Sequence, residues 1–319
     1  MSEPAVTIVI PTHNRPKSLA RAIASVRAQT VGNWRLIVVD DGSREPAIVP
    51  EDTRITLVRH PIAMGVSVAR NRGTELSSTR LVTFLDDDDR LVPDYLEQVL
   101  PAFGRDRQPA TAMVFARQIL VDPHNADGDP PSVDAPHPTS TERTELFEAR
   151  SDLANARFGC GHGLTILRTE LERLGGFDPA LRYGEDYDLV TRLLISTAGI
   201  VRQTDNPAIY YTNQQLGGLS RQANARRRAL AHLYIFRKNR IALEKRSGAV
   251  PFFFRFISRD MIHNGLMWQG LRVIHYGLRR YGAHPLLVKA MVNSHFHRLK
   301  LRLVVSRSDK PSGHGSHLA

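Results

Sequence analysis

The first hundred residues alternate short apolar runs with turn residues and helical patterns. Buried strands are predicted at Val6 to Ile10, Trp34 to Val39 and Leu81 to Leu85, with another at Ile55 to Val58. A strand, a helix and a strand in succession form a βαβ unit, whose two strands run parallel. The pattern therefore predicts an α/β fold with a mostly parallel central sheet and flanking helices.

Two helices are predicted between these strands. Leu19, Ile23 and Val26 recur at helical spacing after the loop of Pro11 to Pro16, and Ser18 is the expected N-cap. The segment from Met64 to Gly73 predicts the beginning of a second helix.

Two of the predicted strands end in carboxylates. Asp40 and Asp41 follow the second strand, and Asp86 to Asp89 follow the fourth. In open α/β sheets, ligands bind beyond the carboxyl ends of the strands. Adjacent like charges also favour a hard cation with oxygen ligands. A solvated acidic turn explains Asp86 to Asp89 taken alone, whereas two converging strand ends favour a pocket.

Charge is distributed unevenly along the 319 residues. Residues 1–220 hold 23 basic and 29 acidic residues, whereas residues 221–319 hold 20 basic and three acidic ones. This asymmetry predicts an anionic partner for the C-terminal third, such as a membrane surface or a polyanionic substrate. The single cysteine, Cys160, excludes an intrachain disulfide and fits a reducing compartment. Neither a signal peptide nor a transmembrane helix is expected.

The C-terminal third predicts helices. A basic helix is expected from Ala225, and a second helical pattern follows Pro251. Apolar residues of that second pattern recur at spacings of three, four and seven: Phe254, Ile257, Met261, Trp268, Leu271 and Leu278. With arginines around them, they suit a helix on a membrane surface. Packing on the rest of the chain or across a homodimer is the alternative, and nucleic-acid binding is disfavoured because no recognition motif is present.

Residues between the fourth strand and this basic region carry further candidates. Residues 122–140, with His124 and His137, are predicted to form a loop in which these histidines are solvated. A glycine-rich approach at 158–168 leads to another strand. Acidic residues at 185–188 open a helix, where they would complement the helix dipole.

Six motifs occur along the chain in a fixed order. They are Val-Ile-Pro-Thr-His-Asn, Val-Val-Asp-Asp-Gly-Ser, Ala-Arg-Asn-Arg-Gly, Phe-Leu-Asp-Asp-Asp-Asp-x-x-x-Pro, Gly-Gly-Phe-Asp and Gly-Glu-Asp-x-Asp-Leu. Each motif is weak alone, but the ordered set is specific. Over residues 5–220 the chain resembles the family 2 glycosyltransferases. The resemblance implies a GT-A, Rossmann-like fold and a metal-dependent, inverting transfer from a nucleotide-diphosphate sugar.

The resemblance implies roles for the residues around the donor. The donor would be bound by Pro11, Thr12, Asp41, Arg70, Asp86 and Asp87. Asp86 and Asp88 would hold Mg²⁺ or Mn²⁺, with Asp88 as the most direct ligand. Asp89 is expected to cap the turn that follows. UDP is favoured as the nucleotide of the donor sugar over dTDP or GDP.

The resemblance also implies how the acceptor side works. Asp186 matches the catalytic base, which removes a proton from the acceptor hydroxyl. His162 and Glu185 would lie toward the acceptor, which is expected to be a glycan or a lipid-linked intermediate. The expected place of action is the cytoplasm, with peripheral attachment to an anionic membrane surface through residues 223–305.

The implied domain organisation follows the motifs. A catalytic domain would span residues 1–220, with the nucleotide sugar bound by 1–100 and the acceptor and base in 101–220. A basic helical region would follow at 221–305. The tail, 306–319, is polar and expected to be flexible.

The chain departs from the family pattern at two points. It has no Gln-x-x-Arg-Trp motif, which marks processive synthases, so one or a few additions are expected. The stretch from Tyr210 to Ser220 has no histidine, which puts a second protein contact to the metal or diphosphate in doubt.

Two other functions compete with the transferase. A sugar nucleotidyltransferase would need a glycine-rich N-terminal phosphate loop, which Pro11 to Pro16 is not. A non-catalytic polyanion- or membrane-binding protein with a degenerate site is disfavoured, because Asp41, Asp86 to Asp88 and Asp186 are all present.

Overall fold

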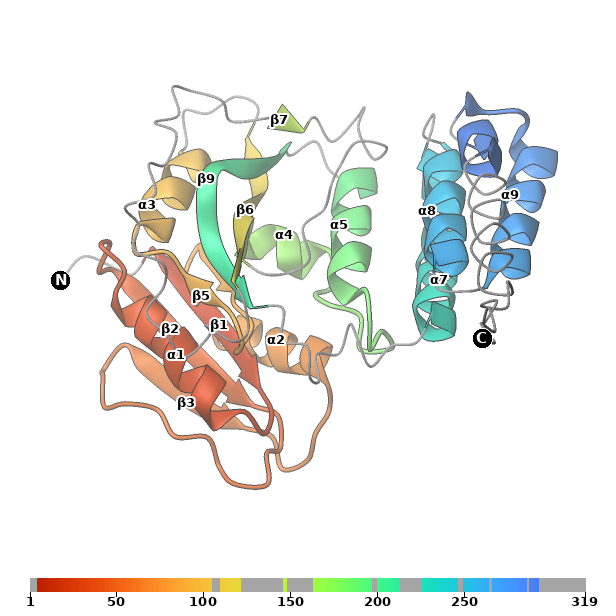
Figure 1. Cartoon of the computed structure of the whole chain (residues 1–319). Coiled ribbons are helices and arrows are strands. Elements are labelled where there is room, and N and C mark those ends of the chain that lie inside the picture. Colours follow the sequence, from red (N-terminus) through yellow and green to blue (C-terminus); the bar gives the residue numbers. More distant parts are fainter. Residues whose placement is uncertain are drawn as a thin grey trace, which may run out of the picture. The chain divides into compact units, whose positions relative to one another are not determined.

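The chain forms two compact units. The computed structural model describes residues 5–104, 110–121, 146–147, 163–196, 200–212, 225–245, 249–263, 266–285 and 287–292 (Figure 1). The first unit is Met1–Ala223 and the second is Asn224–Ala319. Within these described ranges, every strand belongs to the first unit and the second unit is helical.

A single sheet is the framework of the first unit. The strands are β1 (Val6–Thr12), β2 (Trp34–Asp40), β3 (Ile55–Arg59), β4 (Leu81–Phe84), β5 (Arg90–Leu91), β6 (Thr111–Val121), β7 (Leu146–Phe147), β8 (Leu164–Leu167) and β9 (Ile200–Thr212). Their order is β3-β2-β1-β4-β8-β6-β9-β5, and β7 pairs with β9. The strands β1 to β4, β6 and β9 share one direction, whereas β5, β7 and β8 oppose it. The prediction of a mostly parallel sheet is confirmed.

Helices connect the strands of the first unit. They are α1 (Pro16–Arg27), α2 (Val66–Glu75), α3 (Tyr95–Val99), the 3-10 helix η1 (Leu100–Phe103), α4 (Arg168–Arg173) and α5 (Glu185–Ser196). Leu19, Ile23 and Val26 of α1 are buried, as their spacing predicts. The prediction of Ser18 as N-cap is wrong, because Pro16 opens the helix and Arg15 takes the N-cap position without a side-chain cap bond.

Strand β1 continues two residues beyond its predicted end. Thr12 O accepts from Asp41 N and Val9 O accepts from Leu85 N, so alternate residues of β1 face β2 and β4. Pro11 faces β4, whose pairing with β1 stops at Val9 and Phe84. The missing N–H of Pro11 therefore interrupts no ladder, and the strand extends to Thr12. This extension carries Thr12 to the edge where β4 delivers its carboxylates.

Helix α2 lies unusually close to the sheet. A Cβ at Gly73 would come within 2.3 Å of Val9 Cγ1, so only glycine permits this approach. The contact fixes the helix against β1, and Arg70 of this helix reaches Asp86 beyond the end of β4. Arg70 is consequently almost fully buried, with 3% of its side chain exposed.

The second unit contains α7 (Ala225–Glu244), α8 (Ala249–His263) and α9 (Met267–Tyr281). The predicted basic helix from Ala225 is α7, and α8 packs against both α7 and α9 (Figure 1). None of the helices in the described part of the chain combines the length and the apolar character needed to span a bilayer.

The apolar stripe predicted after Pro251 is not one exposed face. It is divided between two helices, because α8 ends at His263 and α9 begins at Met267. Phe254, Ile257 and Met261 are buried, whereas 64% of Trp268 is exposed. The first half of the predicted membrane-facing stripe is thus part of the core of this unit.

Candidate active site

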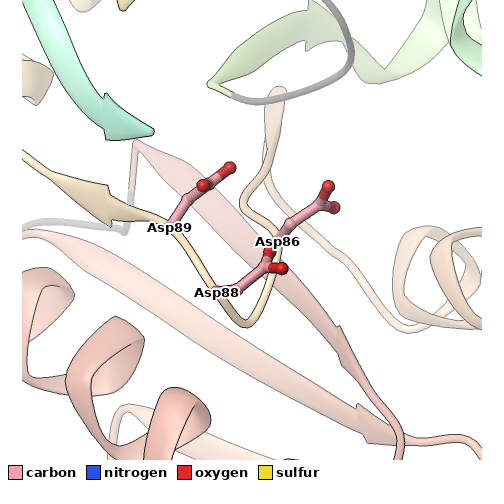
Figure 2. A group of neighbouring side chains, drawn as sticks. All are labelled: Asp86, Asp88 and Asp89. Carbon is pink, nitrogen blue, oxygen red and sulfur yellow. The ribbon is translucent and has the colours of Figure 1, made fainter. Parts of the chain in front are cut away.

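A tight turn after β4 gathers three carboxylates. The backbone N–H of Asp89 donates to Asp86 O over 3.1 Å, which closes the turn. Oxygen atoms of Asp86, Asp88 and Asp89 all lie within 4.8 Å of one another (Figure 2). Asp89 is 1% exposed and belongs to this cluster, while its capping of the following turn stays a prediction.

Asp87, the fourth carboxylate of the turn, is bound by Thr12 and Arg15. Thr12 Oγ1 donates to Asp87 Oδ2 over 2.7 Å, and Arg15 Nη1 donates to Asp87 Oδ1 over 3.0 Å. The same Arg15 nitrogen donates to Asp88 Oδ2 over 2.8 Å. The end of β1 and the loop after it therefore hold the acidic turn from one side.

Burial and mutual repulsion disfavour the ionised form of two carboxylates in the turn. Burial, together with the repulsion of Asp86, Asp89 and Asp87, raises the pKa of Asp88 to about 7 despite the opposing effect of Arg15. Burial likewise raises the pKa of Asp87, although Arg15 and Thr12 oppose the rise. Clustered carboxylate oxygens in a poorly solvated place are suitable ligands for Mg²⁺ or Mn²⁺, so the residues fit the predicted cation.

Asp41, at the end of β2, organises the next loop. Its Oδ1 contacts His60 Nδ1 at 2.8 Å and accepts from Met64 N over 2.9 Å, while Oδ2 accepts from Gly65 N over 2.7 Å. Burial would raise the pKa of Asp41, but the hydrogen bonds from His60 and the two backbone N–H groups lower it below its usual value. Asp41 is thus held as a carboxylate, and its Oδ2 keeps capacity for a further donor.

Glycine is required beside Asp41. Gly42 has a φ of +69°, and a Cβ there would come within 2.4 Å of Ile62 C. The loop before α2 therefore lies directly against the end of β2. This packing explains why the Asp-Asp-Gly sequence ends the strand.

Arg70 joins the acidic turn to helix α5. Its Nη2 donates to Asp86 Oδ1 over 2.7 Å, and its Nη1 donates to Glu185 Oε1 over 2.8 Å. The guanidinium carbon lies 5.2 Å from the ring centroid of Phe177. Burial would lower the pKa of Arg70, but Asp86, Glu185 and Asp186 raise it above its usual value, so the charge is permanent.

Asn71 fixes the segment that leads to α5. Its Nδ2 donates to Phe177 O over 2.8 Å, and its Oδ1 accepts from Phe177 N over 2.8 Å. The Asn71 side chain thus makes the two hydrogen bonds with the Phe177 backbone that a neighbouring strand would make. Ser67 adds a bond from its hydroxyl to Leu181 O at 3.2 Å. Helix α2 therefore connects the acidic turn, through Arg70, with the segment before α5, through Asn71 and Ser67.

The three acidic residues that open α5 differ in burial and in hydrogen-bond partners. Asp188 is fully buried and accepts from Arg192 Nε over 2.7 Å, while Arg192 also donates to Leu174 O and Gly176 O. Burial and the nearby Asp186 raise the pKa of Glu185, although Arg70 opposes the rise. Asp186 is half-buried, and its Oδ1 accepts from Tyr187 N over 2.7 Å. Asp188 is therefore structural, whereas Glu185 and Asp186 lie at the site.

The structure brings together most of the predicted site residues. Hydrogen bonds link six of them to one another or to Arg15: Thr12, Arg70, Asp86, Asp87, Asp88 and Glu185. His162, Cys160 and residues 122–140 lie outside the described residues. Sequence reasoning did not identify Arg15, His60 and Asn71, and each of them acts through a partner at least 19 residues away.

A match to a protein-family model identifies the family of the chain. The model of glycosyl transferase family 2 matches residues 7–175, just over half of the chain. The chain belongs to glycosyl transferase family 2. The match covers β1, the acidic turn and α4, and it makes this protein a glycosyltransferase rather than a sugar nucleotidyltransferase.

Known family 2 enzymes are similar over parts of the chain. An uncharacterised glycosyltransferase of Haemophilus influenzae is 28% identical over 210 residues, which cover 65% of this chain and 68% of that protein. The Escherichia coli UDP-Glc:alpha-D-GlcNAc-diphosphoundecaprenol beta-1,3-glucosyltransferase WfgD is 36% identical over 101 residues, which cover 30% of this chain and 40% of that protein.

A solved structure confirms the predicted GT-A fold of this family 2 enzyme. The S. aureus TarS complex with UDP-GlcNAc has a TM-score of 0.62 to the chain at 14% identity. The superposition covers 91% of this chain and 80% of that one. At such low identity the likeness shows the fold alone.

Proposed function

We propose that this transferase moves a sugar from a nucleoside-diphosphate sugar to a hydroxyl acceptor, with inversion and with Mg²⁺ or Mn²⁺. The observation that carries the proposal is the bridge made by Arg70. One buried guanidinium pairs with Asp86 of the acidic turn and with Glu185, beside Asp186. The bridge thereby connects carboxylates suited to a cation with a carboxylate suited to proton transfer.

The acidic turn is the proposed cation site. Asp86, Asp88 and Asp89 would hold the cation, which extends the predicted pair of ligands by Asp89. A cation bound there supplies electrostatic stabilisation to the leaving diphosphate. Arg15 and Arg70 would hold the turn in shape, through Asp88 and Asp86 respectively.

The donor nucleotide is proposed to bind along the ends of β1, β2 and β4, within residues 1–100. Pro11, Thr12, Asp41 and Asp87 line these ends, and Thr12 and Asp87 are already bonded to each other. We propose UDP as the nucleotide of the donor, with dTDP and GDP as alternatives. UDP-sugars appear in the names of both the TarS complex and WfgD.

Arg70 is proposed to position the site rather than to bind the nucleotide. Both terminal nitrogens of the guanidinium donate to carboxylates of the protein. A residue that fixes Asp86 and Glu185 at once keeps the cation site and the start of α5 in register. This role replaces the nucleotide contact predicted from the sequence.

Asp186 is the proposed general base. As the acceptor oxygen attacks the anomeric carbon, its proton passes to the Asp186 carboxylate. The new C–O bond forms on the face opposite the leaving group, and the bond from the anomeric carbon to the diphosphate breaks. One carboxylate suffices, because the diphosphate leaves as an anion and needs no proton. Glu185 would face the acceptor while paired with Arg70.

The acceptor is proposed to be a glycan or a lipid-linked intermediate, bound by residues 101–220 with His162 among them. WfgD is named for a diphosphoundecaprenol-linked acceptor, which supports this class. We also propose a cytoplasmic site of action and peripheral attachment to an anionic membrane through residues 223–305. A homodimer is the alternative use of that region.

Calorimetry with nucleotides tests the donor site directly. UDP, dTDP and GDP are titrated into the full chain with Mn²⁺ and again after chelation. We expect binding that depends on Mn²⁺ and is strongest for UDP. If none of the three nucleotides binds in the presence of Mn²⁺, the proposed donor site is wrong. A screen of nucleotide sugars, scored by nucleotide release with candidate acceptors, then identifies the sugar.

A further inference from the structure

The outward face of α7 carries an apolar row where a polar surface is expected. Leu230, Tyr234 and Ile241 are spaced by four and seven residues, which places them on one stripe of the helix. They are 55%, 42% and 75% exposed. The buried residues of α7 lie on the opposite side: Ala229, His232, Ile235, Phe236, Asn239 and Leu243. The row therefore lies at the centre of the solvent face, where a helix packed on one side is normally most polar.

Basic residues flank this row on both sides. Arg227, Arg237, Lys238 and Lys245 are exposed and lie three or four residues from a member of the row. Between residues 227 and 245, all of which are described, the only acidic residue is Glu244. Its Oε1 accepts from Arg240 Nε and from Tyr281 Oη, each over 2.9 Å, so it belongs to the packing between α7 and α9. The solvent face of α7 is thus apolar at its centre and basic at its margins.

Helix α9 shows the same combination. Trp268 and Tyr276 are 64% and 53% exposed, and the exposed Arg272 and Arg279 lie at helical spacing beside them. No acidic residue occurs between Met267 and Tyr281. Two helices of one unit therefore expose apolar or aromatic residues among arginines, which makes an accident of composition at a single helix a poor explanation.

We propose that α7 lies on an anionic lipid bilayer, with Leu230, Tyr234 and Ile241 inserted at the headgroup boundary and the flanking cations against lipid phosphates. An apolar row on a basic helix matches the interfacial mode of binding. The row spans about 17 Å along the helix axis at ~1.5 Å per residue, which suits a helix parallel to the surface. The surface differs from the stripe predicted after Pro251, whose first half is buried.

This inference deepens the proposed membrane attachment and rests on it, but not on sugar transfer. It places a lipid-linked or membrane-bound acceptor at the same surface as the enzyme. Charge selects the occupant: a second copy of the chain would bring another basic face against this one, whereas an anionic bilayer offers the opposite charge.

Vesicle binding by the full chain tests the inference. The probes are sonicated vesicles of phosphatidylcholine with phosphatidylglycerol, and vesicles of phosphatidylcholine alone. The wild-type chain should bind the anionic vesicles and not the neutral ones. The double variant Leu230→Glu with Ile241→Glu should bind at least about tenfold more weakly. Removing one flanking charge, by Arg237→Gln or Lys238→Gln, should weaken binding about fivefold.

Matched controls separate this surface from general effects. Ile48 is 86% exposed and lies in the first unit, so Ile48→Glu adds the same charge at an equally accessible isoleucine and should leave vesicle binding unchanged. Thermal unfolding and Mn²⁺-dependent UDP calorimetry, both without vesicles, check that each variant is folded. These readouts also keep failure of the donor-site proposal apart from failure of this one.

Three results would overturn the inference. The first is no binding of the wild-type chain to anionic vesicles. The second is vesicle binding that the double variant leaves intact or that Ile48→Glu weakens equally. The third is a dimeric wild-type chain, seen by sedimentation velocity, that becomes monomeric in the double variant, since α7 would then bind a second copy.

Discussion

Two acidic segments of the first unit contain the same residue types in different surroundings. In the turn after β4, Asp86, Asp88 and Asp89 approach one another, and Asp88 is left with a pKa raised to about 7. At the start of α5, two of the three carboxylates have arginine partners: Asp188 pairs with Arg192, and Glu185 pairs with Arg70.

The difference indicates a division of work. Crowded carboxylates favour a cation, because each ionised carboxylate raises the cost of ionising the next. At the start of α5, carboxylates are paired with arginines instead, and one carboxylate there suffices for the proposed proton transfer. Arg70 forms ion pairs with both segments.

The largest expected effect comes from removing that connection. Arg70→Ala leaves Asp86 and Glu185 without their positively charged partner in a poorly solvated place. The free energy of unfolding should therefore fall by about 3–5 kcal/mol. Arg70→Lys keeps the charge but cannot reach both partners, and should cost less. Urea unfolding measures both changes.

A neighbouring arginine provides the control for Arg70. Arg72 is on the same helix but is 44% exposed and pairs only with Glu75, three residues away. Arg72→Ala should change the free energy of unfolding by less than about 1 kcal/mol. Equal losses in the Arg70→Ala and Arg72→Ala variants would contradict a stabilising role for the ion pairs of Arg70.

Asp186→Asn separates proton transfer from binding. The amide cannot take a proton from the acceptor, so transfer should fall at least ~10²-fold, while UDP affinity in Mn²⁺ stays unchanged. Initial rates of nucleotide release, compared with calorimetry on the same preparation, measure the two effects. Near-normal transfer by this variant would remove Asp186 from the mechanism.

Cation binding should stabilise the first unit through the acidic turn. At a free Mn²⁺ concentration 100 times its dissociation constant, the free energy of unfolding should rise by about 2.7 kcal/mol. Thermal unfolding with and without Mn²⁺ measures the rise. The same titration on Asp88→Asn should show little or none of it, and an undiminished rise in that variant would place the cation elsewhere.

The raised pKa of Asp88 predicts a gradual pH dependence of stability. A carboxyl whose pKa is about 7 in the folded chain and 3.8 when unfolded binds a proton more strongly in the folded state. Without a cation, its contribution to stability is therefore present below pH 3.8 and is lost as the pH rises toward 7. The loss is at most about 1.4 kcal/mol per pH unit. Unfolding curves of wild type and Asp88→Asn should diverge over this window, and parallel curves would contradict it.

Local patterns in the sequence were sufficient for the strands and for their acidic ends. Each of β1, β2 and β4 is a short apolar run, and parallel pairing then places Thr12, Asp41 and the acidic turn at one edge. These features depend on residues close together in the chain, which is why the sequence predicts them.

Pairings between distant residues could not be predicted in this way. Arg70 and Glu185 are 115 residues apart, and Asn71 and Phe177 are 106 apart, so periodicity contains no information about either contact. Asp89 joins the cluster because the turn closes through its own N–H, a matter of backbone geometry. The prediction of one continuous apolar stripe after Pro251 was wrong for a related reason. The spacing of its residues continues across the break between α8 and α9, where a new helix begins.

The most direct test of the division of work is a side-by-side titration of UDP, in Mn²⁺, into the Asp88→Asn and Asp186→Asn variants. Loss of a carboxylate ligand should weaken the Mn²⁺-dependent binding of UDP by at least ~10-fold. The Asp186→Asn variant should bind UDP as the wild-type chain does and yet fail to transfer sugar. Equal loss of UDP affinity in both variants would contradict the assignment of cation and proton chemistry to separate segments.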